Sequence, residues 1–178
     1  KMEQMLRSDG AVWARALPER IEAKRPATPR APVLVGFLPG CIGSVMFEKV
    51  NRQAVELLSA CGAEVVVPGA QGCCGAIHHH NGDHHHAAEL ARRNIDVFVP
   101  REGNPVDYVV TDIAGCGAAL REYDFLLRDD AAYAERAKVF ASKVRDISEV
   151  LMQLGLPEMT HPVDLTITYH DACHLAHA

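Results

Sequence analysis

Four short apolar runs recur along this chain, and a turn that carries a cysteine follows each of them. Residues with helical spacing separate the runs. Strands that alternate with helices are typical of a mostly parallel sheet. We therefore predict an α/β fold, a mostly parallel sheet flanked by helices. The predicted strands are residues 33–38, 63–68, 106–112 and 164–169.

Between these runs, apolar residues repeat every three or four positions, which predicts amphipathic helices. In the second helix Val50, Ala54, Leu57, Leu58 and Cys61 form the apolar stripe, so we expect Cys61 to be a buried structural residue. Asp83 is placed to cap the third helix. The predicted helices are residues 11–24, 45–61 and 84–98, one that opens at residues 115–117, and one from about residue 130 to 154.

The composition fits a globular protein, with 48% hydrophobic and 23% charged residues among 178. The net charge of −5 argues against a nucleic-acid-binding surface. No apolar run reaches the length of a membrane span. The chain begins at Lys1 and shows no signal peptide, and prolines gather in residues 26–32. We expect an internal piece of a soluble protein, with an N-terminal helix and linker over residues 1–32.

Five of the six cysteines follow a predicted strand end. The loops that leave the carboxyl ends of parallel strands gather at one edge of a sheet, so we expect their thiols to converge there. Thiolates are soft ligands that suit an iron–sulfur cluster or zinc. A disulfide framework is disfavoured, because adjacent cysteines rarely bridge to each other. These five residues are Cys41, Cys73, Cys74, Cys116 and Cys173.

Four ordered motifs resemble the cysteine-rich "CCG" domain, which occurs in one of the subunits of heterodisulfide reductase and in the iron–sulfur subunit of glycolate oxidase. The glycolate oxidase branch is the more similar one. The resemblance implies that the domain binds an iron–sulfur cluster, which we expect to be 4Fe-4S, through Cys41, Cys73, Cys74 and Cys116. It also implies two copies of the domain. The motifs are GCIGSV (40–45), QGCCGA (71–76), AGCGAALREY (114–123) and YHDACHLAHA (169–178).

From this resemblance we expect an electron-transfer subunit of a glycolate oxidase complex rather than its catalytic subunit. FAD would sit on a partner flavoprotein, and electrons would leave towards a quinone-type acceptor. The expected location is the cytoplasm, and the alternative is peripheral attachment to the inner membrane. One alternative is a heterodisulfide-reductase-like or lactate-utilisation redox module, although Cys116 lacks the C-x2-C partner of the former. The other is a structural zinc domain.

The runs VLVGFLPGC and LTITYHDAC are similar to each other and lie 132 residues apart. We interpret them as equivalent parts of two copies of one module. The first copy then covers residues 33–160, and residues 161–178 begin a second copy. Cys173 would belong to a second, incomplete metal site rather than to the first one.

Six histidines flank the turn at residues 81–83. We expect most of them to be exposed, with His78 the nearest to the cysteine site. His170, Asp171 and His174 surround Cys173, but we read that cysteine as a ligand and not as a nucleophile. Tyr123 and Glu122 could line the site, with packing the expected role of Tyr123. Arg92, Arg93 and Arg121 are predicted on solvated helix faces.

Overall fold

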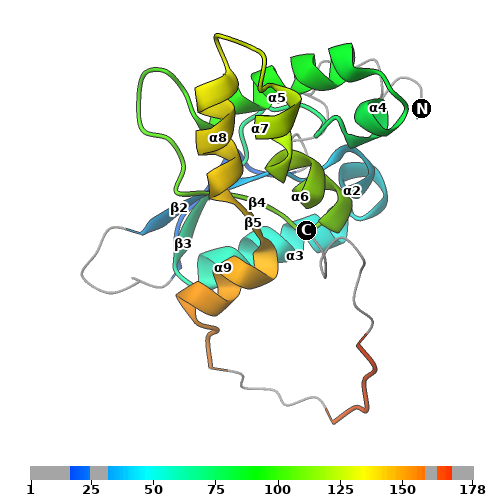
Figure 1. The fold of residues 1–178 in the computed structure, drawn as a ribbon. Helices are drawn as coiled ribbons and strands as arrows, with labels where there is room; N and C mark the ends of the chain where they lie inside the picture. The colour runs from blue at the N-terminus through cyan, green and yellow to red at the C-terminus, as the bar shows by residue number, and fades with distance from the viewer. Residues whose placement is uncertain (1–16, 25–31, 159–163, 170–178) are drawn as a thin grey trace.

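The computed structural model of the chain describes residues 17–24, 32–158 and 164–169, and they form a single sheet with helices on both faces (Figure 1). The sheet has five strands in the order β1-β3-β2-β4-β5. Strands β2 to β5 are parallel, and β1 runs antiparallel to β3. The predicted α/β class is confirmed. The strands are β1 (Arg20–Ile21), β2 (Val33–Phe37), β3 (Ala63–Val66), β4 (Tyr108–Thr111) and β5 (Val144–Asp146).

Eight helices occur in the described residues, and they divide between the two faces of the sheet. Helices α3 and α9 share one face, while α5, α6, α7 and α8 cover the other (Figure 1). None of the described helices is both long and apolar enough to cross a membrane. The helices are α2 (Cys41–Met46), α3 (Glu48–Ala60), α4 (Ala76–His80), α5 (His84–Phe98), α6 (Ala114–Arg121), α7 (Tyr123–Leu126), α8 (Ala134–Lys143) and α9 (Ile147–Leu154).

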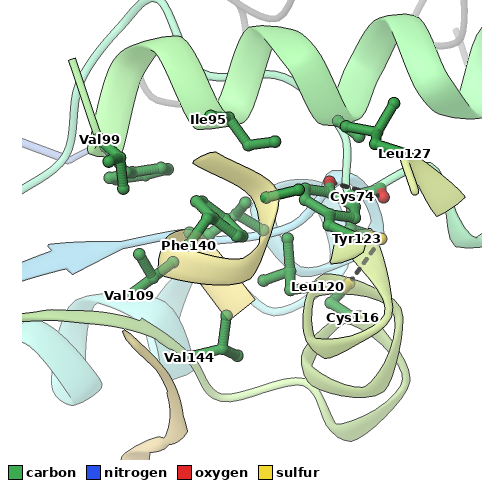
Figure 2. Packing of buried hydrophobic residues seen from close by; sticks show 14 of the residues in the cluster. Cys74, Ile95, Val99, Val109, Cys116, Leu120, Tyr123, Leu127, Phe140 and Val144 are labelled. Atoms are coloured by element: carbon green, nitrogen blue, oxygen red, sulfur yellow. Dashed lines mark hydrogen bonds between the residues drawn. The ribbon is translucent and has the colours of Figure 1, made fainter. Parts of the chain in front are cut away.

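An aromatic group fills the core beneath α5, α7 and α8 (Figure 2). The Tyr123 ring stacks on Phe140 with 5.1 Å between centroids, and Phe98 lies 6.3 Å from Phe140. Cys74 and Cys116 belong to the same buried cluster. The core on this face therefore extends to the thiol groups at the end of the sheet.

The long helix predicted over residues 130–154 is wrong, because a strand divides it. Helix α8 ends at Lys143, β5 pairs with β4, and α9 begins at Ile147. Val144 is fully buried in the sheet, where a β-branched side chain packs well. Asp146 then accepts a hydrogen bond from the backbone N–H of Ser148 and starts α9 with a capping box.

The strand predicted over residues 164–169 is also wrong, since the described residues of this segment form no strand. Leu165, Ile167 and Tyr169 are 71%, 81% and 72% exposed. Alternation of apolar and polar residues favours a strand only where a neighbour and a buried face are present. The described sheet gives this segment neither a neighbouring strand nor a buried face. Cys173 lies outside the described residues, as do His170, Asp171 and His174, so the second site stays a prediction.

Two helix predictions near the amino-terminal half need correction. Where a helix was expected over residues 11–24, Arg20 and Ile21 form β1 instead; residues 11–16 lie outside the described part. In α3 the buried face is rotated from the predicted stripe. Val50 and Leu57 are 49% and 38% exposed, and Asn51, Ala54, Val55 and Leu58 are buried.

Candidate metal centre

Four cysteines lie where three neighbouring parallel strands end. Cys41 opens α2 directly after β2, Cys73 and Cys74 lie in the loop after β3, and Cys116 lies in the first turn of α6 after β4. Strand β2 stands between β3 and β4. The chain passes from β2 to β3 on one side, and then from β3 across β2 to β4 on the other side. Such a switch point at the carboxyl edge is where open α/β sheets bind ligands.

The structure brings the four thiols together in two contacting pairs. The Sγ atoms of Cys41 and Cys73 lie 3.8 Å apart, and those of Cys74 and Cys116 lie 3.3 Å apart (Figure 2 shows the second pair). Cys73 and Cys74 are adjacent in the chain and so join the two pairs. All four are free thiols. The four side chains meet at the predicted edge of the sheet. Metal binding by these side chains stays a prediction.

Burial shields most of this group from water. Cys41, Cys74 and Cys116 are buried, at 8%, 4% and 9% exposed, and Cys73 is half-buried. A buried thiol is hard to ionise, because the charged form loses its hydration. The group is therefore reached from solvent mainly at Cys73.

Contact between the thiols changes their acidity further. The hydrogen bond that Cys74 donates to Cys116, together with burial, raises the pKa of Cys74 to about 12. The hydrogen bond with Cys73, together with burial, raises the pKa of Cys41 strongly. For Cys73 the bond with Cys41 lowers the pKa, but the Cys74 thiol and burial outweigh it, and the pKa stands at about 11. Without a cation, Cys41, Cys73 and Cys74 stay protonated at neutral pH.

The turn before Cys41 requires a glycine. Gly40 has a φ of +67°, a conformation that side chains with a Cβ rarely adopt. A Cβ at this position would lie 2.7 Å from Cδ1 of Ile113 and 3.4 Å from Sγ of Cys116. The absence of a side chain lets the loop after β2 approach the loop after β4.

A buried asparagine and a buried tyrosine hold the loop that carries Cys73 and Cys74. Asn94 accepts a hydrogen bond from Gly72 N at 2.8 Å, and its Nδ2 donates to the carbonyl of Cys73 at 3.0 Å. Tyr123 Oη donates to the carbonyl of Cys74 at 2.9 Å (Figure 2). The same hydroxyl accepts from Asn94 Nδ2 at 3.0 Å. Both residues thus position the adjacent cysteines.

The sequence alone does not reveal this role, because Asn94 lies within the helix predicted over residues 84–98 and packing is the role expected of Tyr123. A polar residue inside an apolar helical stripe was the available signal, because a buried amide needs hydrogen-bond partners. Two further buried side-chain amides also bind backbone carbonyl groups of the loop after β2 or the end of that strand. Gln71 donates to the carbonyl of Phe37 at 3.2 Å, and Asn51 donates to that of Pro39 at 3.1 Å.

A groove of about 340 Å³ opens beside Cys41, between α2, α3 and the loop before α6. Asn51 Oδ1 and Asp112 Oδ1 are buried there without a hydrogen-bond partner. Burial raises the pKa of Asp112 to about 6. The groove is lined by Ile42, Gly43, Phe47, Val50, Asn51, Asp112, Ile113 and Ala114.

On the other side of the site, a cavity of about 10 Å³ adjoins Cys74. His79, Glu122 and Tyr123 are among its lining residues, so Glu122 and Tyr123 lie beside Cys74. That they line a metal site stays a prediction. The histidine that lines this cavity is His79. That His78 is the histidine nearest to the four thiols stays a prediction. His78 is bound to Asp83.

Cys61 lies apart from this group. It follows the last turn of α3 and is fully buried. Asn51, near the first turn of the same helix, contacts the loop before Cys41. Cys61 follows ten positions later, about 15 Å along the helix. The buried position of Cys61 at the end of α3, away from the four thiols, agrees with the structural role predicted for it.

The three arginines expected on solvated faces all have partners. Arg92 pairs with Asp130, and Arg121 pairs with Glu149. Arg93 Nε donates to the carbonyl of Ala70 at 2.7 Å, just before the loop of Cys73 and Cys74. Arg93 therefore adds a contact between α5 and that loop.

Residues 35–121 match the family model of the cysteine-rich domain, CCG. The probable glycolate oxidase iron-sulfur subunit of Bacillus subtilis (strain 168) is 41% identical over 143 residues, 79% of this chain and 32% of that protein. The glycolate oxidase iron-sulfur subunit of Escherichia coli (strain K12) is 30% identical, covering 95% of this chain and 44% of its own length.

A third relative, lactate utilization protein A of Halalkalibacterium halodurans, is 34% identical over 76% of this chain and 54% of its own length. The chain thus spans about a third to a half of these three relatives. No solved structure matches it.

Proposed function

Because this chain belongs to the cysteine-rich (CCG) domain family, we propose that Cys41, Cys73, Cys74 and Cys116 hold one iron–sulfur cluster. The chain would be part of the iron–sulfur electron-transfer subunit of a glycolate oxidase complex. The relatives named for iron–sulfur proteins support this proposal. The single observation that carries it is the convergence of four free thiols, with Sγ contacts of 3.8 and 3.3 Å.

The donor atoms of these residues fit such a group. Four thiols are the donor set that iron–sulfur clusters use. The raised pKa values of Cys41, Cys73 and Cys74 mean that a cation is needed to stabilise their thiolates, so binding releases protons. Gly40 and Gly75, both at positive φ, let the backbone come close to the sulfurs.

When bound, a cluster of this kind gains and loses single electrons. The chain's own residues set its surroundings. The backbone N–H of Gly75 donates to Cys73 Sγ over 3.5 Å, and hydrogen bonds to cluster sulfurs raise the reduction potential. Asn94 and Tyr123 keep the two adjacent cysteines in place, and the buried core behind Cys74 excludes water.

Apolar residues exposed around Cys41 support docking of a redox partner here. Val45, Met46 and Phe47 are 49%, 69% and 53% exposed on α2 and at its end. A contiguous apolar surface of this kind marks an interaction site. We infer that a flavoprotein subunit carrying FAD delivers electrons at this surface. They would pass on to a quinone-type acceptor, with the complex in the cytoplasm and peripheral to the inner membrane.

One distance favours a second candidate, a structural zinc site. Two thiolates on one tetrahedral zinc stand about 3.8 Å apart, given bonds of about 2.3 Å. The Cys41 and Cys73 sulfurs have that spacing. A cluster would need wider spacing, because each thiolate binds a different iron atom, and the loops would have to open. Against zinc, the chain lacks the paired C-x2–4-C ligands that structural zinc sites use.

The test is redox spectroscopy on anaerobically purified protein. The proposal predicts a broad absorbance at about 400 nm that dithionite bleaches and a soluble quinone restores. A colourless protein with one zinc per chain would establish the second candidate. A cluster that dithionite reduces and no quinone reoxidises would leave electron transfer to a quinone unsupported.

A further inference from the structure

We propose that His78, Asp83 and His86 form a second metal site, which binds one divalent cation such as Zn²⁺ independently of the four thiols. One ligand atom from each of these residues lies within 4.8 Å of the others. The residues come from α4, from the turn between α4 and α5, and from the first turn of α5. The site goes beyond the proposed electron-transfer function, which uses none of these side chains.

The carboxylate of Asp83 stands between the two imidazoles. Its Oδ2 lies 3.3 Å from Nδ1 of His78 and 2.8 Å from Nδ1 of His86. The two imidazole rings are 5.7 Å apart between centroids. Two ring nitrogens and a carboxylate thus converge on one point, and the ion would take the place of the protons that now join them.

The backbone fixes this arrangement before any ion binds. Asp83 N donates to the carbonyl of His78 at 2.9 Å, which closes the turn, and Gly82 supplies the positive φ of +80° that the turn needs. Asp83 also caps α5 by accepting from His86 N. Because the three residues are already held near one another, binding requires little ordering of the chain.

Nitrogen from imidazole and oxygen from carboxylate are donors that suit Zn²⁺, and three protein ligands leave one position for water. The side chains are open to solvent, at 31%, 39% and 61% exposed for His78, Asp83 and His86, so an ion can enter directly. Helix α4 begins directly after Gly75. A bound ion would therefore fasten α4 to α5 just beyond the loop of Cys73 and Cys74.

A neighbouring group competes for the same ion. His85, His86 and Glu89 also bring their ligand atoms together, but all three are exposed. His85 Nδ1 lies 3.8 Å from Glu89 Oε1, and both sit on one helix without a turn to hold them. Ordering three exposed side chains costs entropy, which favours the group around Asp83.

The experiment is a titration of the ¹⁵N-labelled chain with ZnCl₂, followed by the histidine ring-nitrogen NMR signals. These signals report each histidine separately, so zinc bound at the thiols is not confused with this site. The proposal predicts that the signals of His78 and His86 shift together as a single site fills. No shift at either ring with millimolar zinc would overturn it.

Matched variants locate the ion. Asp83→Asn keeps the helix cap, because asparagine caps as well as aspartate. Asp83→Asn and His78→Asn should each weaken zinc binding, measured at the histidine rings that shift, by at least about tenfold. His85→Asn and Glu89→Gln should leave the affinity unchanged within about twofold, since they belong only to the competing group. The reverse pattern would place the ion on His85 and Glu89 and refute the proposal. Iron content should be the same in all four variants, so this test is separate from that of the cluster.

Discussion

The hydroxyl group of Tyr123 donates a hydrogen bond to the backbone carbonyl of Cys74 over 2.9 Å, although 49 residues separate them in the chain. The same hydroxyl accepts from Asn94, whose amide also binds the carbonyl of Cys73. Tyr123 is almost fully buried. The loop with the adjacent cysteines is therefore held from the core, and its geometry depends on polar contacts that water does not replace.

We predict that Tyr123→Phe lowers the free energy of unfolding by about 1–3 kcal/mol, because a buried carbonyl and a buried amide each lose a partner. Urea unfolding monitored by circular dichroism measures this. Tyr133→Phe is the control, since its hydroxyl binds Asp96 at the surface, and it should cost less than about 1 kcal/mol. Equal losses in both variants would show that the bond to Cys74 stabilises the fold no more than the surface bond of Tyr133 does.

Gly40→Ala should reduce the cluster content, because the new Cβ would sit 2.7 Å from Ile113 and force a positive φ on alanine. The loop that carries Cys41 would then move away from Cys116. Gly117→Ala is the matched control, since its Cβ would meet its nearest atom at 3.6 Å. Iron per chain after reconstitution is the measurement. Full iron content in Gly40→Ala would contradict the need for close approach here.

Cys61→Ala should leave the iron content unchanged and cost only about 1 kcal/mol of stability, the effect of a small cavity in the core. Cys61 is fully buried behind α3 and is not one of the four converging thiols. Iron analysis and urea unfolding on the same sample measure both quantities. If iron were lost while the fold stayed intact, Cys61 would have to be counted as a ligand.

Asp112 makes stability fall as pH rises. Burial raises the pKa of its carboxyl from 3.8 to about 6 in the folded chain, so the folded state holds the proton more tightly than the unfolded state. Its favourable contribution is complete below about pH 4 and is lost as the pH rises through about 6.

The variant Asp112→Asn cannot titrate and should remove this effect. Its free energy of unfolding relative to the original chain should increase between about pH 4 and about pH 7 and stay level above that. Unfolding curves at several pH values give the difference. A difference that does not change over this range would show that Asp112 titrates normally.

The parts of the fold that follow from strand order could be predicted from sequence. Three apolar runs gave β2, β3 and β4, and because parallel strands end at one edge, the convergence of Cys41, Cys73, Cys74 and Cys116 followed from their places after those runs. This inference needs only topology, which local patterns carry well.

What failed depends on contacts between distant residues. Strand β5 has three residues, too short for a period-2 pattern, and its flanks have helical spacing. Pairing with β4 overrides that local preference. The role of Asn94 was equally hidden, because its partners Gly72, Cys73 and Tyr123 come from other parts of the chain.

The most direct test of the central claim counts iron and acid-labile sulfide per chain after anaerobic reconstitution, in the original chain and in Cys74→Ser. Cys74 contacts Cys116 at 3.3 Å and is the most buried of the four thiols. We predict about four iron and four sulfide ions per chain in the original protein and loss of most of both in the variant. One zinc ion with no sulfide, or an iron content unchanged by Cys74→Ser, would contradict the assignment of the four thiols as cluster ligands.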